Sequence, residues 1–237
     1  MRVTSSALAG ISFFLLIPNA GASFVLSLNL LDPNDLVSWS RLGDPGSGIS
    51  TAFSTDSVAG VQVFGNFAQP RGGTVAEVCP AANCDYAAAP GFQTGDFLIW
   101  TEDAAGNGTG PLTMVFSRPV QGAGVYLQVT APSIFAAEIT EIAASNTNSY
   151  SALSTTGDPL FLGVLDSAPD ITGITVGGLS CAGTSPGLCA PTDFAIDSVY
   201  LVTNVPESGV PISVALGLGL LLGSVRKQVC QLLGRSL

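Results

Sequence analysis

The chain has 237 residues and a formal net charge of −10, from 7 basic and 17 acidic side chains. It contains no histidine, which excludes Ser-His-Asp and Cys-His triads, histidine acid–base catalysis and every histidine-ligated metal site. The few basic residues also argue against nucleic acid as a partner, because they form no basic patch that would neutralise phosphates.

The first 22 residues have the three parts of a secretory signal peptide. Arg2 supplies the positive charge, and residues 7–17 form an apolar stretch of 11 residues, which is too short to span a bilayer. Ala20 and Ala22 then form an A-x-A cleavage site. We therefore expect export by the Sec machinery, with Ser23 as the mature N-terminus.

Residues 23–204 are expected to form a single all-β domain. Short runs of β-branched and aromatic residues are separated by Gly, Pro, Asn and Ser, and no stretch has a convincing helical period. Strands without intervening helices predict a β-sandwich or a jelly roll. A β-like segment is expected at residues 24–31, and the clearest strands at 61–67, 97–101, 112–117, 124–130, 135–143, 160–166, 171–176 and 194–202, with a hairpin loop at 102–110.

The run at 194–202 is expected to be a central strand, because both of its faces are largely apolar. Regular alternation places Phe194, Ile196, Ser198, Tyr200 and Val202 on one face. The opposite face then carries Ala195, Asp197, Val199 and Leu201.

Four of the five cysteines lie on the expected exported side: Cys79, Cys84, Cys181 and Cys189. Export makes disulfides the default, and four cysteines allow three connectivities. The short spacings favour the local pairs Cys79–Cys84 and Cys181–Cys189. A four-thiolate zinc site is the alternative, although the seven residues between Cys181 and Cys189 exceed the usual ligand spacing.

An enzyme without histidine would most plausibly use carboxylates. The available clusters are Glu102 with Asp103, in the expected hairpin loop, and Glu138 with Glu141. The latter two are three residues apart and fall on opposite faces of a strand, so they cannot converge without a bend. Both clusters are expected to be solvated, no catalytic residue is assigned, and the sequence favours a protein that is not an enzyme.

Calcium binding is a second possibility for the carboxylates, because calcium takes oxygen ligands and needs no histidine. The candidate ligands are Asp166, Asp170, Asp193 and Asp197, which would converge if their loops met at one edge of a jelly roll. No other metal or cofactor is indicated.

Aromatic side chains can stack on sugars, and four are candidates: Trp39, Trp100, Tyr126 and Tyr150. Trp100 is expected in the core, and Trp39 is left open between core and surface.

The C-terminal segment 210–225 has 16 residues without a charge and is followed by Arg226 and Lys227. We expect it to be a transmembrane helix, at about 24 Å a thin fit to the hydrocarbon core. The basic pair predicts that the tail stays inside and the β-domain outside.

Val205, Pro206 and Glu207, the apolar segment, and Arg226 with Lys227 together resemble the PEP-CTERM sorting signal of Gram-negative bacteria. The resemblance covers residues 205–227 and implies processing by an exosortase, a membrane cysteine protease, after a stage in the inner membrane. Two features depart from the family pattern: Ser208 replaces the usual second proline, and ten residues follow Lys227.

Residues 112–207 also resemble the exported domain that often precedes this signal, through LTMVFSRPVQGAGVYLQ, FAAEITEIA, LFLGVLDSAPDITGITV and DFAIDSVYLVT in that order. This resemblance implies a jelly-roll-like fold and supplies no catalytic residues. The expected function is therefore a non-enzymatic protein delivered to the cell surface or the extracellular polysaccharide, with carbohydrate or calcium as possible ligands. The alternatives are a membrane-anchored adhesion domain that is never cleaved, and a carboxylate-dependent enzyme acting on carbohydrate.

Overall fold

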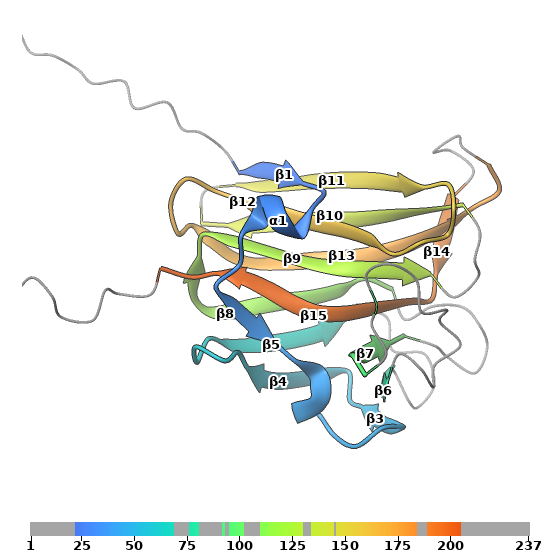
Figure 1. Cartoon of the computed structure of the whole chain (residues 1–237), viewed down its shortest axis with the longest axis horizontal. Helices are drawn as coiled ribbons and strands as arrows, with labels where there is room; N and C mark the ends of the chain where they lie inside the picture. The colour runs from blue at the N-terminus through green and yellow to red at the C-terminus, as the bar shows by residue number, and fades with distance from the viewer. Residues whose placement is uncertain are drawn as a thin grey trace, which may run out of the picture. The chain divides into compact units, whose positions relative to one another are not determined.

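The computed structural model of the protein describes residues 22–68, 76–80 (backbone only), 92, 95–101, 110–129, 134–144, 146–183 and 189–204. Over these ranges the chain forms fifteen strands in two antiparallel sheets, together with a one-turn α-helix and one 3₁₀ turn (Figure 1). The expected all-β class is confirmed.

The first sheet, sheet A, has eight strands, in the order β1-β12-β9-β15-β7-β6-β3, with β2 paired to β15. Its long strands β9 and β15 lie at the centre, and β15 is buried on both faces over most of its length. The expectation of a central strand at 194–202 is confirmed. The bounds of these strands are β1 Ser23–Val25, β2 Asp35–Val37, β3 Ser47–Ile49, β6 Ala76–Pro80, β7 Phe97–Trp100, β9 Gly122–Val129, β12 Leu160–Leu165 and β15 Phe194–Val202.

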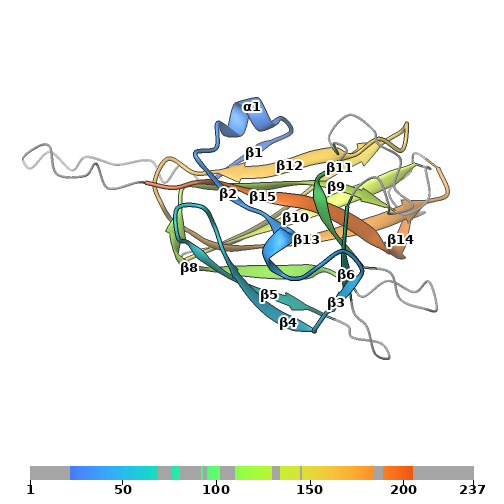
Figure 2. The same ribbon diagram turned by 60° about the horizontal axis from the view of Figure 1, so that its bottom comes forward.

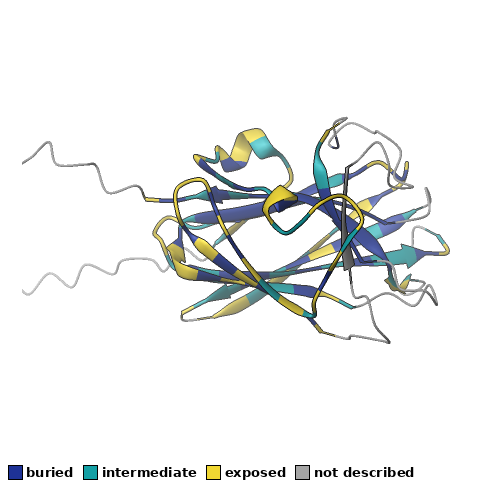
Figure 3. Cartoon of the chain, turned by 90° about the horizontal axis from the view of Figure 1, so that it is seen from below, coloured by how far each residue is buried: buried dark blue, intermediate teal, exposed yellow. Residues whose placement is uncertain are grey.

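The second sheet, sheet B, has seven strands, in the order β11-β10-β13-β8-β5-β4, with β14 paired to β13. In β5, QVFGNF, exposed and buried residues alternate strictly, as expected for a strand with one face on a core and one in solvent (Figure 3). The bounds are β4 Ala52–Asp56, β5 Gln62–Phe67, β8 Leu112–Val120, β10 Phe135–Ala143, β11 Thr147–Ser154, β13 Ile171–Cys181 and β14 Cys189–Thr192.

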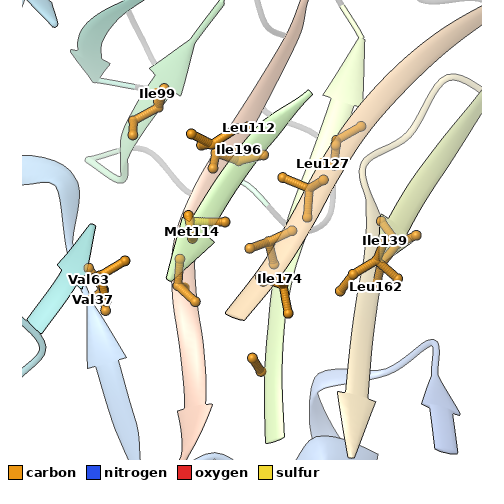
Figure 4. Packing of buried hydrophobic residues seen from close by; sticks show 14 of the residues in the cluster. Val37, Val63, Ile99, Leu112, Met114, Leu127, Ile139, Leu162, Ile174 and Ile196 are labelled. Atoms are coloured by element: carbon orange, nitrogen blue, oxygen red, sulfur yellow. The ribbon is translucent and has the colours of Figure 1, made fainter. Parts of the chain in front are cut away.

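The two sheets share one hydrophobic core, to which both contribute buried aliphatic and aromatic side chains (Figure 2). Figure 4 shows members of this core, among them Leu127 and Leu162 from sheet A and Ile139 and Ile174 from sheet B. All four are fully buried. Burial of each such side chain stabilises the fold by about 2 kcal/mol relative to its exposure, which makes this shared layer the main source of stability.

Sheet A is also covered on its outer face, the face turned away from the shared core. Two further apolar clusters lie there, one around Leu98 and Trp100 and the other around Leu31 and Phe161. The helix α1 (Leu28–Leu31) contributes Leu31 to the second cluster. This second layer explains why β9 and β12 are apolar on both faces.

Two local expectations were wrong. Residues 24–31 do not form one extended segment: β1 ends at Val25, and α1 begins at Leu28 and ends at Asp32, whose backbone is left-handed (φ 51°). Regular alternation along 194–202 also fails, because the pairing of β15 with β9 shifts by a β-bulge between Ile196 and Val199. The extra residue puts Phe194, Ile196, Val199 and Leu201 all into the shared core.

The chain separates into two units, Met1–Val202 and Thr203–Leu237, and of the second only Thr203 and Asn204 are described. No helix within the described ranges is long and apolar enough to cross a membrane. The segment expected to do so, residues 210–225, lies outside those ranges.

Candidate functional site

Three aromatic side chains gather on the outer face of sheet A, on the adjacent strands β12, β9 and β15. The ring centroids of Tyr126 and Phe161 are 5.0 Å apart, and Tyr200 lies 6.1 Å from Tyr126 and 6.2 Å from Phe161, all in edge-on arrangements. The strand next to them carries Gly124, where a Cβ atom would come within 2.6 Å of the Phe161 ring. Glycine at this position therefore lets the rings lie flat against the sheet.

Asp197 extends this group, which we call the outer aromatic cluster: Tyr126, Phe161, Tyr200 and Asp197. The β-bulge of β15 contains Asp197, which is 2% exposed. Its Oδ1 accepts a hydrogen bond from the Ser198 backbone N–H, and its Oδ2 accepts one from the Tyr200 hydroxyl at 2.9 Å. Its backbone carbonyl accepts a hydrogen bond from the Trp39 indole. The bulge thus serves both sides of the sheet, a side chain outside and a carbonyl inside.

Burial raises the pKa of Asp197 above its ordinary value, against the opposing effect of the hydrogen bonds from Ser198 and Tyr200. The nearby negative charge of Asp96 raises the Asp197 pKa further. Burial and the negative charge of Asp197 raise the pKa of both Tyr200 and Tyr126. The two tyrosines therefore keep their protons at neutral pH and act as hydrogen-bonding groups, not as bases.

The outer aromatic cluster combines aromatic faces with hydroxyl groups, and both tyrosines remain partly exposed. Such groups can bind a polar ligand by stacking and hydrogen bonds. The Asp197 carboxyl is already occupied by Ser198 and Tyr200, so its role is to orient Tyr200.

The four candidate calcium ligands, Asp166, Asp170, Asp193 and Asp197, do not gather at one edge of the sheets. Asp166 follows the end of β12 that pairs with Gly122, whereas Asp193 precedes the end of β15 that pairs with Val129. Gly122 and Val129 are the two ends of β9, about 23 Å apart at the rise of a strand. The expected convergence was wrong, because β12 and β15 run in the same direction on either side of β9. Within the described ranges no three carboxylate or thiol side chains are placed to hold a metal.

Of the carboxylate clusters considered for catalysis, Glu138 and Glu141 lie on opposite faces of β10, as expected. Glu138 is exposed, but Glu141 is fully buried, so the expectation that both are solvated was wrong. Glu141 shares the inward face of β10 with Phe135 and Ile139, a position set by the register and not by its polarity. Glu102 and Asp103 lie outside the described residues.

A second buried carboxylate, Asp35, was missed at the sequence level. Its Oδ1 accepts hydrogen bonds from the backbone N–H groups of Leu36 and Ala59, both at 2.8 Å, and its Oδ2 accepts one from the Ser57 hydroxyl. These bonds fasten the β4–β5 turn to β2, so the role of Asp35 is structural. Nothing in the local sequence distinguishes it from a solvated loop aspartate.

Cys181 and Cys189 form a disulfide that joins the facing ends of β13 and β14 (S–S 2.07 Å). Cys79 lies in β6, and Cys84 lies outside the described residues. Of the expected signal-cleavage residues, Ala22 and Ser23 are described and Ala20 is not. The sorting residues Val205, Pro206, Glu207, Arg226 and Lys227 all lie outside the described ranges.

The four aromatic side chains considered for sugar stacking are divided between interior and surface. Trp39 is fully buried and Trp100 is 9% exposed, which places both in apolar clusters. Tyr126 belongs to the outer aromatic cluster. Tyr150 is half-buried and stacks on Phe24 at 5.0 Å.

Comparison with known proteins gave no match: no protein-family model fits this chain, and neither a curated protein nor a solved structure is significantly similar to it.

Proposed function

We propose that this chain is an exported, non-enzymatic bacterial protein, sorted to the cell surface or the extracellular polysaccharide by an exosortase that recognises its C-terminal signal. The observation that carries the proposal is the order of features along the chain. An A-x-A export signal comes first, one β-domain follows, and Val205-Pro206-Glu207, an apolar segment and Arg226-Lys227 complete it.

The fold supports this division of the chain. The strands begin at Ser23 and end at Val202, so they occupy the segment between the two proposed signals. The chain passes repeatedly between the sheets, with β8, β10 and β13 in sheet B and β9, β12 and β15 in sheet A, which supports the jelly-roll-like class. The Cys181–Cys189 disulfide suits an oxidising compartment outside the cytoplasm.

The charge distribution limits the extracellular partner. Residues 23–207 hold all 17 acidic side chains but only Arg41, Arg71 and Arg118, a formal charge of −14. A domain of this charge stays soluble and is repelled by anionic polysaccharides unless divalent cations lie between them. We therefore propose a neutral polysaccharide, or an anionic one bridged by cations, as the partner, with the outer aromatic cluster as the described surface best suited to it.

The proposal is tested by expressing the chain in a bacterium that encodes an exosortase. The parent protein is expected in the surface or extracellular fraction without detergent. A variant with Val205, Pro206 and Glu207 all changed to Ala is expected to stay in the membrane fraction at full length, and the matched control Glu138→Gln is expected to behave as the parent. Detergent-dependent extraction of both parent and variant would instead support an anchored adhesion domain.

A further inference from the structure

Glu141 has an unusual environment for a carboxylate. It is fully buried, and no arginine or lysine pairs with it in the described ranges. Its Oε2 accepts one hydrogen bond, from the Asn148 side chain at 3.1 Å, while the buried Oε1 has no hydrogen-bond partner. A buried carboxylate oxygen without a donor is costly, so a donor or a positive charge is missing from this position.

The residues around Glu141 connect it to the beginning of the β-domain. Tyr150 lies diagonally across from Glu141 on the inward face of the β10–β11 pair, since its direct partner is Ile139 and that of Glu141 is Asn148. The negative charge of Glu141 helps to raise the pKa of Tyr150, behind the larger effect of burial.

Tyr150 in turn contacts β1, which pairs with the edge of sheet A through β12 (Figure 1). Its ring stacks on Phe24 with an interplanar angle of 2°. Its hydroxyl donates a hydrogen bond of 3.0 Å to the carbonyl oxygen of Ala22. That carbonyl belongs to the peptide bond between Ala22 and Ser23, the bond that the sequence marks for cleavage.

Cleavage would change the hydrogen bonds available here. Water adds to the Ala22–Ser23 peptide bond, Ala22 leaves with a carboxylate, and Ser23 keeps an ammonium group at neutral pH. Tyr150 has a single hydroxyl hydrogen, which the uncleaved chain commits to Ala22. Loss of Ala22 frees that hydrogen for Glu141 and places a positive charge beside the tyrosine oxygen.

We propose that the α-ammonium group of mature Ser23 is the missing partner: it donates to the Tyr150 hydroxyl, which donates to Glu141, so that the processed N-terminus neutralises the buried carboxylate. The inference rests on the proposed export, because it requires cleavage at Ala22. The β-domain would then be completed only after the signal peptide has been removed.

Three ionisable groups lie near the new amino group. Glu141 and Tyr150 face it from β10 and β11, and Asp166 follows Leu165, the β12 partner of Ser23. Asp166 is partly exposed and its Oδ1 accepts hydrogen bonds from Ser167, so it is the competing anion that a test has to exclude.

The single lysine of the chain, Lys227, makes the test specific. In a Lys227→Arg background the α-amino group is the only primary amine of the exported protein. Its N-terminal residue is first identified by sequencing, and the amine is then labelled by reductive methylation with ¹³C-formaldehyde and titrated by NMR. We expect the amine to titrate above the ordinary pKa of about 8, and a pKa higher by about 1 lowers the unprotonated fraction of the amine about tenfold at a given pH.

The variants separate the possible causes. Glu141→Gln is expected to lower the titration midpoint of the amine, and Tyr150→Phe, which keeps the ring, is expected to lower it as well. The exposed neighbour in the matched variant Glu138→Gln, and the competing anion in Asp166→Asn, are expected to leave the midpoint unchanged.

A Ser23 terminus whose midpoint is equal in the parent and in Glu141→Gln would overturn the inference while leaving the proposed export intact. A mature terminus at any other residue would overturn both the cleavage site and the inference.

Discussion

The β-bulge of β15 makes a specific energetic prediction, because it buries the carboxyl of Asp197 next to two hydrogen-bond donors. In Asp197→Ala the Ser198 N–H and the Tyr200 hydroxyl lose their acceptors, and each unsatisfied buried donor costs about 1–3 kcal/mol. We therefore expect a loss of about 2–4 kcal/mol in the free energy of unfolding at pH 7. The matched change Asp197→Asn keeps an acceptor for Ser198 and places an amide beside Tyr200, so it is expected to cost less than about 1 kcal/mol.

The same pair of proteins predicts a pH dependence. The pKa of Asp197 is raised in the folded protein from an ordinary value of 3.8. Between 3.8 and that raised value the folded state binds more protons than the unfolded state, so this group makes stability fall as the pH rises, up to the folded pKa. Asp197→Asn removes this contribution, and the stability difference between parent and variant should change across that interval in favour of the variant.

Urea denaturation followed by tryptophan fluorescence measures both effects, since the buried Trp39 donates its indole hydrogen to the backbone of Asp197. Parallel stability curves for parent and Asp197→Asn from pH 3 to pH 7 would refute the reasoning. A cost for Asp197→Ala no larger than that of Asp197→Asn would refute it too, because it would mean that the two donors do not depend on this carboxyl.

Three further predictions concern the rest of the β-domain. Replacing Cys181 and Cys189 together by Ser is expected to lower the free energy of unfolding by about 2.5 kcal/mol, the closure entropy of their short loop, and equal stability of the reduced and oxidised parent protein would contradict this. Asp35→Ala is expected to cost about 3 kcal/mol in urea denaturation, because three donors lose their acceptor, whereas Asp35→Asn should cost clearly less. Adding calcium or a chelator should leave the thermal midpoint unchanged within about 1 °C, since the candidate ligands are dispersed; a calcium-dependent rise of several degrees would show a coupled site.

The strands that could be predicted were those with a strong local signal. The runs around Val63, Leu112, Ile139 and Ile174 are β-branched or aromatic and bounded by turn residues, so local preference and tertiary packing favour the same structure. The short strands β2, β3 and β4 have no such signal, because three to five residues acquire strand geometry only from the neighbours with which they pair.

The residues that sequence reasoning misplaced depend on register. Glu141 is buried because its neighbours Phe135 and Ile139 fix the inward face of β10, and polarity alone assigned it to solvent. Asp197 lies in a bulge, and a bulge adds one residue without a sequence signal, which reverses every face that follows it. The outer aromatic cluster was therefore only partly predictable: Tyr126 was considered a surface aromatic residue, but its contacts with Phe161 and Tyr200 depend on strand order.

The central claim is that one exported β-domain is released by processing at both ends. Intact-mass analysis of the protein recovered outside the cell, compared with the membrane fraction, tests it most directly. The account predicts a mature chain that starts at Ser23 and ends near Glu207, while the membrane fraction holds a precursor with residues 226–237. Recovery of those C-terminal residues in the extracellular protein, or of a chain that retains Arg2, would contradict the account.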